Sequence, residues 1–134
     1  MSQKNPYVFI SYSHSDWKIV EELSRYLEQQ GCHVLIDRKD FQLGSSLQSE
    51  IEKALNKADI IIVVLSKDAI ASNWVKTEIG YAMATNKSIL PVLVDDVDLP
   101  LYLSQFNFLD LRQKIRATEL EDAIAHSFEK LSKR

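Results

Sequence analysis

The sequence has very few of the residues that several kinds of chemistry require. Its 134 residues include one cysteine, three glycines and three histidines. A single cysteine, Cys32, cannot form an intrachain disulfide, and we expect it to be a small core residue rather than a nucleophile. Three scattered glycines supply neither a dinucleotide-binding G-x-G-x-x-G turn nor a P-loop. The histidines lie in unrelated segments, which predicts no metal site.

Long apolar runs and an excess of basic charge are also absent. The longest aliphatic run, residues 60–65, is far shorter than a membrane span. The first six residues are polar and lack the apolar stretch of a signal peptide. The net charge is −3 and the isoelectric point about 5.6, whereas nucleic-acid-binding domains are usually basic. We therefore expect neither a membrane nor a nucleic acid as a partner.

Short apolar runs alternate with helical patterns along the whole chain. The predicted strands are residues 7–10, 32–36, 60–65, 89–94 and 108–111, and the predicted helices are residues 16–30, 47–57, a short segment at 66–71, a helix opened by Ser72, and 117–131. The run 60–65 does not alternate apolar and polar residues, which is typical of a strand covered on both faces. The β-α repeat predicts an α/β fold with a parallel sheet and helices on both faces. The length favours a single domain over residues 1–134.

Three residues are expected to mark particular backbone positions. Gly31 follows the first predicted helix, where a C-terminal cap glycine belongs. Ser72 is a suitable N-cap for the helix after it. Pro91 lies inside a predicted strand, and because proline cannot donate to the ladder, we expect one side of that strand to be unpaired there.

Trp74 and Glu78 are the most informative pair in the chain. They lie four residues apart in a predicted helix, so both belong to one helix face. A flat aromatic surface and a carboxylate on one face suit the cleavage of a nucleoside-type bond. The spacing also arises by chance, and in that alternative the tryptophan packs in the core and the glutamate is solvated.

A series of short motifs resembles the TIR (Toll/interleukin-1 receptor) domain family, and its bacterial form most closely. The motifs are, in order, Tyr7–Ser13, Val34–Asp37, Phe41–Gly44, Ile62–Ser66, the Ser72-x-Trp74-x-x-x-Glu78 segment and Leu90–Val92. This resemblance covers about residues 6–131. It implies a flavodoxin-like three-layer fold whose five-stranded parallel sheet has the order 2-1-3-4-5. We expect the domain to be excised from a longer chain.

The resemblance also implies an activity and partners. Many members cleave NAD+ into nicotinamide and ADP-ribose or a cyclic isomer, so NAD+ is expected as a substrate, with no separate cofactor. In those enzymes the glutamate matching Glu78 is essential, and the aromatic residue matching Trp74 lines the nicotinamide site. The loop at residues 38–46 is the one that members use for self-association, which implies other TIR domains as partners in a homo-oligomer or filament. A cytoplasmic location, or delivery to a host cytoplasm, fits this family.

Five further residues are candidates for substrate contact. Tyr12 and Ser13 follow the first strand, at the end where ligands bind in open α/β sheets, and are expected to contact the ribose or diphosphate. Asp37 ends the second strand and either approaches the substrate or caps its loop. Arg38 and Lys39 either meet the diphosphate or are solvated loop charges.

Two other functions stay open at this point. A TIR domain without turnover would act as an interaction module or scaffold in signalling. A nucleoside deoxyribosyltransferase also combines an α/β sheet with a glutamate, but it explains Glu78 and not the other motifs.

Overall fold

The computed structural model describes residues 5–36 and 47–112, together with residues 122, 125 and 126. Its strands are β1 (Tyr7–Ser11), β2 (His33–Ile36), β3 (Ile60–Leu65), β4 (Ser88–Leu93) and β5 (Leu109–Asp110), and its helices are α1 (Trp17–Gln29), α2 (Leu47–Lys57), α3 (Lys67–Ala71) and α4 (Asn73–Ala84). Single 3-10 turns lie at His14–Asp16 and Leu101–Leu103. The predicted loop 38–46 and nearly all of the predicted helix 117–131 lie outside the described residues.

The five strands form one parallel sheet with the order β2-β1-β3-β4-β5, as the resemblance implied. Strand β3 lies in the middle, pairing Ile62 with Ile10 of β1 on one side and with Leu90 of β4 on the other. All six residues of β3 are buried. The absence of alternation in this run therefore results from apolar layers on both faces of the strand.

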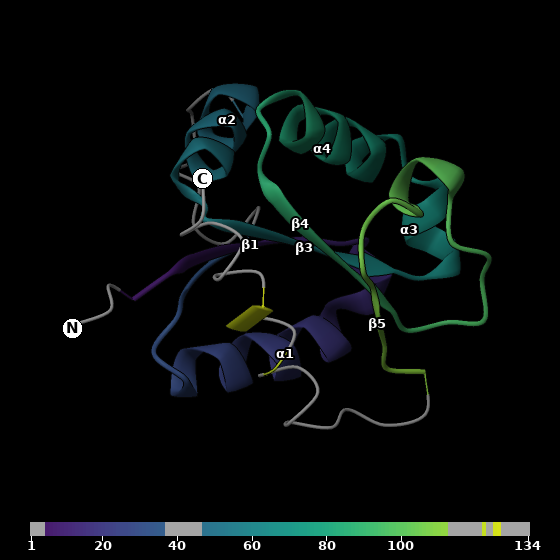
Figure 1. The fold of residues 1–134 in the computed structure, drawn as a ribbon, viewed down its shortest axis with the longest axis horizontal. Coiled ribbons are helices and arrows are strands. Elements are labelled where there is room, and N and C mark those ends of the chain that lie inside the picture. The colour runs from purple at the N-terminus through teal and green to yellow at the C-terminus, as the bar shows by residue number, and fades with distance from the viewer. Residues whose placement is uncertain (1–4, 37–46, 113–121, 123–124, 127–134) are drawn as a thin grey trace.

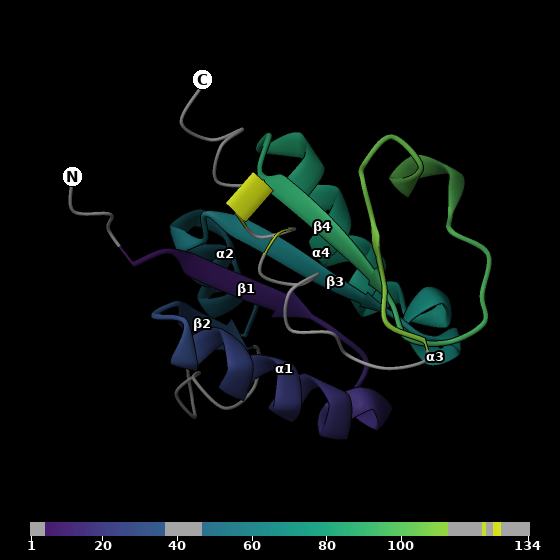
Figure 2. The same ribbon diagram turned by 60° about the horizontal axis from the view of Figure 1, so that its bottom comes forward.

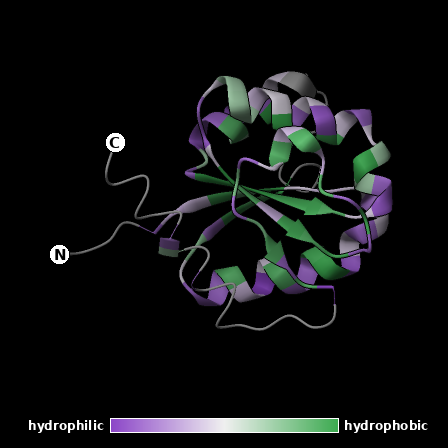
Figure 3. Ribbon diagram, turned by 45° about the vertical axis from the view of Figure 1, so that its right-hand side comes forward, coloured by the Kyte–Doolittle hydropathy of each residue, from purple (hydrophilic) through white to green (hydrophobic). Residues whose placement is uncertain are grey.

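Helices cover both faces of the sheet and make a three-layer molecule. Figures 1 and 2 show α1 on one face, with α2 and α4 on the other. The α1-side core joins Val20, Leu23 and Leu27 of the helix to Val8, Ile10, Ile60, Ile62 and Val64 of the strands. The opposite core joins Leu55 of α2 and Val75, Ile79 and Ala82 of α4 to Phe9, Ile61, Val63 and Leu65. In Figure 3 the strands are hydrophobic and lie between helices of mixed character.

The expected helix ends are confirmed. Gly31 has a φ of +91°, and the N–H groups of Gly31 and Cys32 bond to the carbonyls of Glu28 and Leu27. These are the two bonds of a Schellman motif. Cys32 is buried in the α1-side core, as predicted.

Pro91 is accommodated because β5 is short. Its pairing partner in β3 is Val63, whereas β5 pairs only with Val92 and Leu93 of β4. The strand is therefore unpaired on the β5 side at Pro91, as expected from the missing N–H group. Within the described parts of the chain, no helix is both long and apolar enough to span a bilayer.

Candidate functional site at the carboxyl edge of the sheet

Helix α4 carries the two principal candidate residues, and local interactions fix where it begins. The Ser72 hydroxyl accepts a hydrogen bond of 3.2 Å from the backbone N–H of Val75, which confirms Ser72 as the N-cap. The helix then presents Val75, Glu78, Ile79 and Ala82 to the interior. Glu78 is thus the one charged residue on an otherwise apolar inner face.

Glu78 is buried although it carries a carboxyl group. Its exposed fraction is 2%, and its Oε2 atom is also shielded from solvent. The Ser11 hydroxyl, at the end of β1, donates a 2.6 Å hydrogen bond to Oε1. Burying a charged group is costly unless hydrogen bonds replace those of water, and the bond from Ser11 supplies one such replacement.

Trp74 has the opposite exposure. It lies one helical turn nearer the carboxyl edge of the sheet, and 38% of its surface is exposed. This distribution contradicts the chance alternative on both counts, because that alternative places the tryptophan in the core and the glutamate in solvent. An accessible aromatic surface therefore lies one turn away from a buried carboxylate on the same helix.

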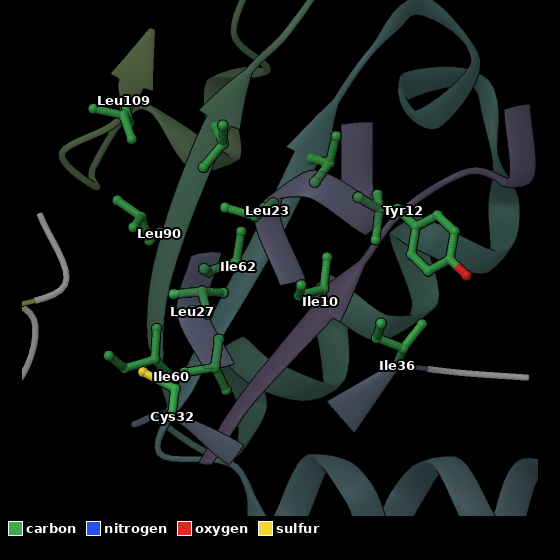
Figure 4. Packing of buried hydrophobic residues seen from close by; sticks show 14 of the residues in the cluster. Ile10, Tyr12, Leu23, Leu27, Cys32, Ile36, Ile60, Ile62, Leu90 and Leu109 are labelled. Atoms are coloured by element: carbon green, nitrogen blue, oxygen red, sulfur yellow. The ribbon is translucent and has the colours of Figure 1, made fainter. Parts of the chain in front are cut away.

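The structure does not bring Tyr12 to Glu78. Successive residues of a strand point to opposite faces, so Ser11 shares the α4 side with Phe9, while Tyr12 shares the α1 side with Ile10. Tyr12 is 3% exposed and belongs to the α1-side core, where Figure 4 shows it with Ile10 and Ile36. Its ring lies 6.0 Å from that of Trp17.

Ser13 belongs to a polar network on the turn after β1. Its hydroxyl lies 3.3 Å from that of Ser15, which donates a 2.6 Å hydrogen bond to Asp68 of α3. Asp16 accepts a hydrogen bond from the Ser66 hydroxyl at the end of β3. These contacts fasten the β1–α1 turn to the start of α3.

The surroundings of Asp16 in this network shift its pKa. Partial burial raises the pKa of Asp16 above its usual value of 3.8, while the hydrogen bond from Ser66 lowers it. Repulsion from Asp95 and Asp68 raises this pKa further. Asp95 is held in place by a 3.0 Å hydrogen bond from the backbone N–H of Lys67.

The remaining candidates are not placed. Asp37, Arg38 and Lys39 lie outside the described residues, and so does the loop at 38–46. Among the residues that are described, no three His, Cys, Asp or Glu side chains gather as they would around a metal ion.

The sequence did not lead us to two features at the carboxyl edge of the sheet, the residue Ser11 and the contact between Asp16 and Ser66. We considered Tyr12 and Ser13 but not Ser11, although the side-chain alternation along β1 places Ser11 and Phe9 on one face. We also missed the contact between Asp16 and Ser66, for which no sequence pattern exists because the two residues are 50 positions apart.

The geometry first defines a broad class. A parallel sheet of this order, with a carboxylate and an aromatic residue on a helix at its carboxyl edge, is an α/β domain of the flavodoxin-like type with a candidate ligand site. The family model described as TIR domain matches residues 8–127. The chain therefore belongs to the TIR domain family.

Curated relatives and solved structures agree with this assignment. The chain is 32% identical over 89 residues to the 2' cyclic ADP-D-ribose synthase BtTIR of Bacteroides thetaiotaomicron, covering 63% of this chain and 31% of that protein. It is 32% identical over 90 residues to the 2' cyclic ADP-D-ribose synthase AbTIR of Acinetobacter baumannii, covering 63% and 34%. The matches thus span only about a third of these two relatives.

Two solved structures illustrate the shared fold. The TIR domain of the Toll-related receptor TRR-2 from Hydra magnipapillata superposes with a TM-score of 0.72 at 21% identity, covering 94% of each chain. A 2-deoxyribosyltransferase from Bacillus psychrosaccharolyticus superposes with a TM-score of 0.66 at 12% identity, covering 87% of this chain and 90% of that one. At these identities the likeness concerns the fold alone.

Proposed function

We propose that this domain cleaves the bond between nicotinamide and ribose in NAD+. The observation that carries the proposal is the buried Glu78 carboxylate, one turn below the exposed ring of Trp74. The proposal is also supported by the two relatives at 32% identity, whose names describe the synthesis of a cyclic ADP-ribose. Their products contain the ADP-ribose that remains after NAD+ loses nicotinamide.

The cleavage step requires little from the protein beyond positioning and charge. When the C1′–N bond breaks, its electron pair passes to the pyridinium nitrogen, so nicotinamide leaves as a neutral molecule and needs no proton from a general acid. Positive charge then builds up on the ribose, as in glycoside cleavage. Glu78 is proposed to stabilise this charge, and Trp74 to stack on the nicotinamide ring.

The fate of the ribose carbon decides the product. If a water molecule attacks C1′, the water loses one proton to solvent and the product is ADP-ribose. If a hydroxyl of the same substrate attacks and loses its proton, a cyclic isomer results. Both outcomes share the step at Glu78, and the names of the two relatives favour the cyclic product.

Substrate binding must open the structure around Glu78. With 2% of its surface exposed, the carboxylate is not in contact with bulk solvent. The ribose therefore reaches it only after neighbouring side chains move, as in enzymes that close around their substrates. Ser13 is proposed to contact the ribose or diphosphate at the rim. A contact from Tyr12, which is buried in the α1-side core, would require the turn after β1 to move as well. Asp37, Arg38 and Lys39 are proposed to complete this rim.

Self-association is part of the proposal. The loop at 38–46 would join copies of the domain, and the active site would then be completed within an assembly. In that case the rate per molecule rises with protein concentration, whereas the rate per molecule of an independent monomeric enzyme does not change.

The test is a time course of NAD+ followed by NMR at several protein concentrations. We expect nicotinamide to appear with the unaltered protein and with Glu28→Gln, a control at an exposed glutamate of α1. Glu78→Gln keeps the size of the side chain and an acceptor for Ser11 but removes the charge, so its rate should fall by about a hundredfold or more. The second product distinguishes ADP-ribose from a cyclic isomer.

The opposing outcome is equally clear. If no nicotinamide is released at any concentration, including conditions that force self-association, the domain is a TIR–TIR interaction module. Glu78 would then be a structural residue held by Ser11.

A further inference from the structure

We infer that Ser11 is a positioning residue that sets the orientation of the Glu78 carboxylate for the cleavage step. The inference rests on the proposed function and names a residue that acts on the same site. Its basis is the 2.6 Å hydrogen bond from the Ser11 hydroxyl to Oε1 of Glu78. A hydrogen bond of this length to a carboxylate is typical of a charge-assisted contact.

The location of Ser11 excludes direct contact with substrate in this conformation. Its exposed fraction is 0%, and it pairs with Val63 of the central strand. Ser11 is therefore held by the sheet, while Glu78 belongs to a helix that packs on the sheet. The hydrogen bond connects these two layers, and it joins a long side chain of the helix to a buried strand beside the central strand of the sheet.

The neighbours of Glu78 on the inner face of α4 are apolar. Val75 and Ala82, one turn before and one turn after, are apolar and buried, and Ile79 lies beside them. None of these side chains carries a hydrogen-bond donor. Among them, a serine hydroxyl at the end of β1 supplies directional control that apolar packing cannot supply.

This role predicts a particular kinetic pattern. Because Ser11 does not touch substrate, its loss should leave KM nearly unchanged. Because the carboxylate then samples wrong orientations, kcat should fall by about ten- to a hundredfold, the range that corresponds to one hydrogen bond to a charged group. The donor also favours the charged carboxylate, so its removal should move the acid limb of the pH–rate profile to higher pH.

Three substitutions separate the hydrogen bond from simple filling of space. Ser11→Ala removes the donor and leaves a small gap. Ser11→Cys nearly preserves the volume but donates only weakly, whereas Ser11→Thr keeps the hydroxyl and suits a strand. Ser88→Ala is the matched control, since Ser88 is also a buried strand serine but lies at the start of β4, at the opposite edge of the sheet.

The experiment measures kcat, KM and the pH–rate profile for nicotinamide release in the unaltered protein and these four variants. The inference predicts that Ser11→Ala and Ser11→Cys lose kcat together and shift the acid limb, while Ser11→Thr and Ser88→Ala stay near the unaltered values. Urea unfolding of each variant shows whether the fold persists. The Thr and Cys variants keep the comparison informative if the Ala variant unfolds.

The experiment distinguishes a failure of the positioning role of Ser11 from a failure of the proposed function. If the unaltered protein releases nicotinamide and Ser11→Cys retains its full kcat and pH profile, the positioning role is overturned and the proposed function stands. If the unaltered protein releases none, the proposed function fails and this inference fails with it. A rise in KM without a change in kcat would identify Ser11 as a binding residue and would also overturn the inference.

Discussion

Asp16 joins the start of α1 to the end of β3 by accepting a hydrogen bond from Ser66. Its pKa is raised mainly by burial, and Asp95 and Asp68 add repulsion. A carboxyl whose pKa is higher in the folded state than in the unfolded chain stabilises the fold while it is protonated. This contribution is fully present at pH values below 3.8, the usual pKa of aspartate. That contribution is lost as the pH rises through the folded-state pKa, so the ionised group opposes folding at neutral pH.

The substitution Asp16→Asn should therefore stabilise the domain at pH 7. Asparagine still offers an oxygen to Ser66 but carries no charge. The difference in unfolding free energy between variant and unaltered protein should narrow as the pH falls and vanish below the usual pKa of 3.8. Urea unfolding at a series of pH values measures it, with Asp98→Asn as an exposed control. A loss of stability at pH 7 would mean that the charge at the N-terminus of α1 outweighs its burial.

Residue spacing predicts which side chains share a face but not which of them is buried. The four-residue interval was sufficient to place Trp74 and Glu78 on one side of a helix. It gave no means to foresee that the carboxylate lies inside and the indole at the rim, because that depends on how α4 sits on the sheet. The alternation of side chains along β1 could have predicted that Ser11 faces α4. No pattern in the sequence could have predicted the contact between Asp16 and Ser66.

At the scale of a single helix, replacing a glycine by alanine should change the unfolding free energy in opposite directions at Gly31 and Gly80. Gly31 ends α1 with a φ of +91°, a backbone conformation that side chains with a Cβ rarely adopt. Gly31→Ala should cost about 1–2 kcal/mol of unfolding free energy. Gly80 lies within α4, where an added Cβ meets no atom within 4 Å, and Gly80→Ala should stabilise by about 0.5–1 kcal/mol.

Thermal or urea unfolding of the two variants gives both values in one series. Each variant is the control for the other, because the chemical change is identical and only the backbone conformation differs. Equal effects of the same sign would contradict the assignment of Gly31 to the C-terminal cap.

Helix and strand positions followed closely from the sequence where local signals were strong. The bounds of α2 match the predicted residues 47–57, and the caps at Gly31 and Ser72 were correctly placed. Strand β1 extends one residue beyond the prediction, through Ser11, because pairing with Val63 of β3 continues there. Local patterns do not report such pairing, so strand ends are harder to predict than helix caps.

At the scale of the whole molecule, the described residues form an apolar core on each face of the sheet, and β3 contributes to both. Ile61 faces the α4-side core and Ile62 the α1-side core. Ile61→Ala and Ile62→Ala should therefore each cost about 2–5 kcal/mol of unfolding free energy. In a sheet with one solvated face, only one of two adjacent residues would show such a cost.

Urea unfolding at neutral pH tests this symmetry, with the exposed Leu101 as the matched aliphatic control. Leu101→Ala should change the unfolding free energy by less than about 0.5 kcal/mol. A small effect at either isoleucine would show that the corresponding layer packs loosely.

The fold as a whole was predictable because two kinds of information agreed. The β-α alternation favours a parallel sheet, and the motif resemblance implied the strand order that the structure has. Neither source specified how the β1–α1 turn is fastened to α3. That arrangement depends on hydrogen bonds from Ser15 to Asp68 and from Ser66 to Asp16, each between residues that are far apart in the sequence.

The exposure of Trp74 gives the domain a built-in optical probe. The chain has two tryptophans, and Trp17 is partly buried against the α1-side core, whereas Trp74 belongs to α4 on the other face of the sheet. In a Trp17→Phe background, all tryptophan fluorescence comes from Trp74, provided that the excitation wavelength is too long for the five tyrosines. An indole at the rim should emit at long wavelength, be quenched by acrylamide, and darken when a nicotinamide ring stacks on it. Tryptophan emission would thus report occupancy even in the Glu78→Gln variant, where product should accumulate more slowly by about a hundredfold or more.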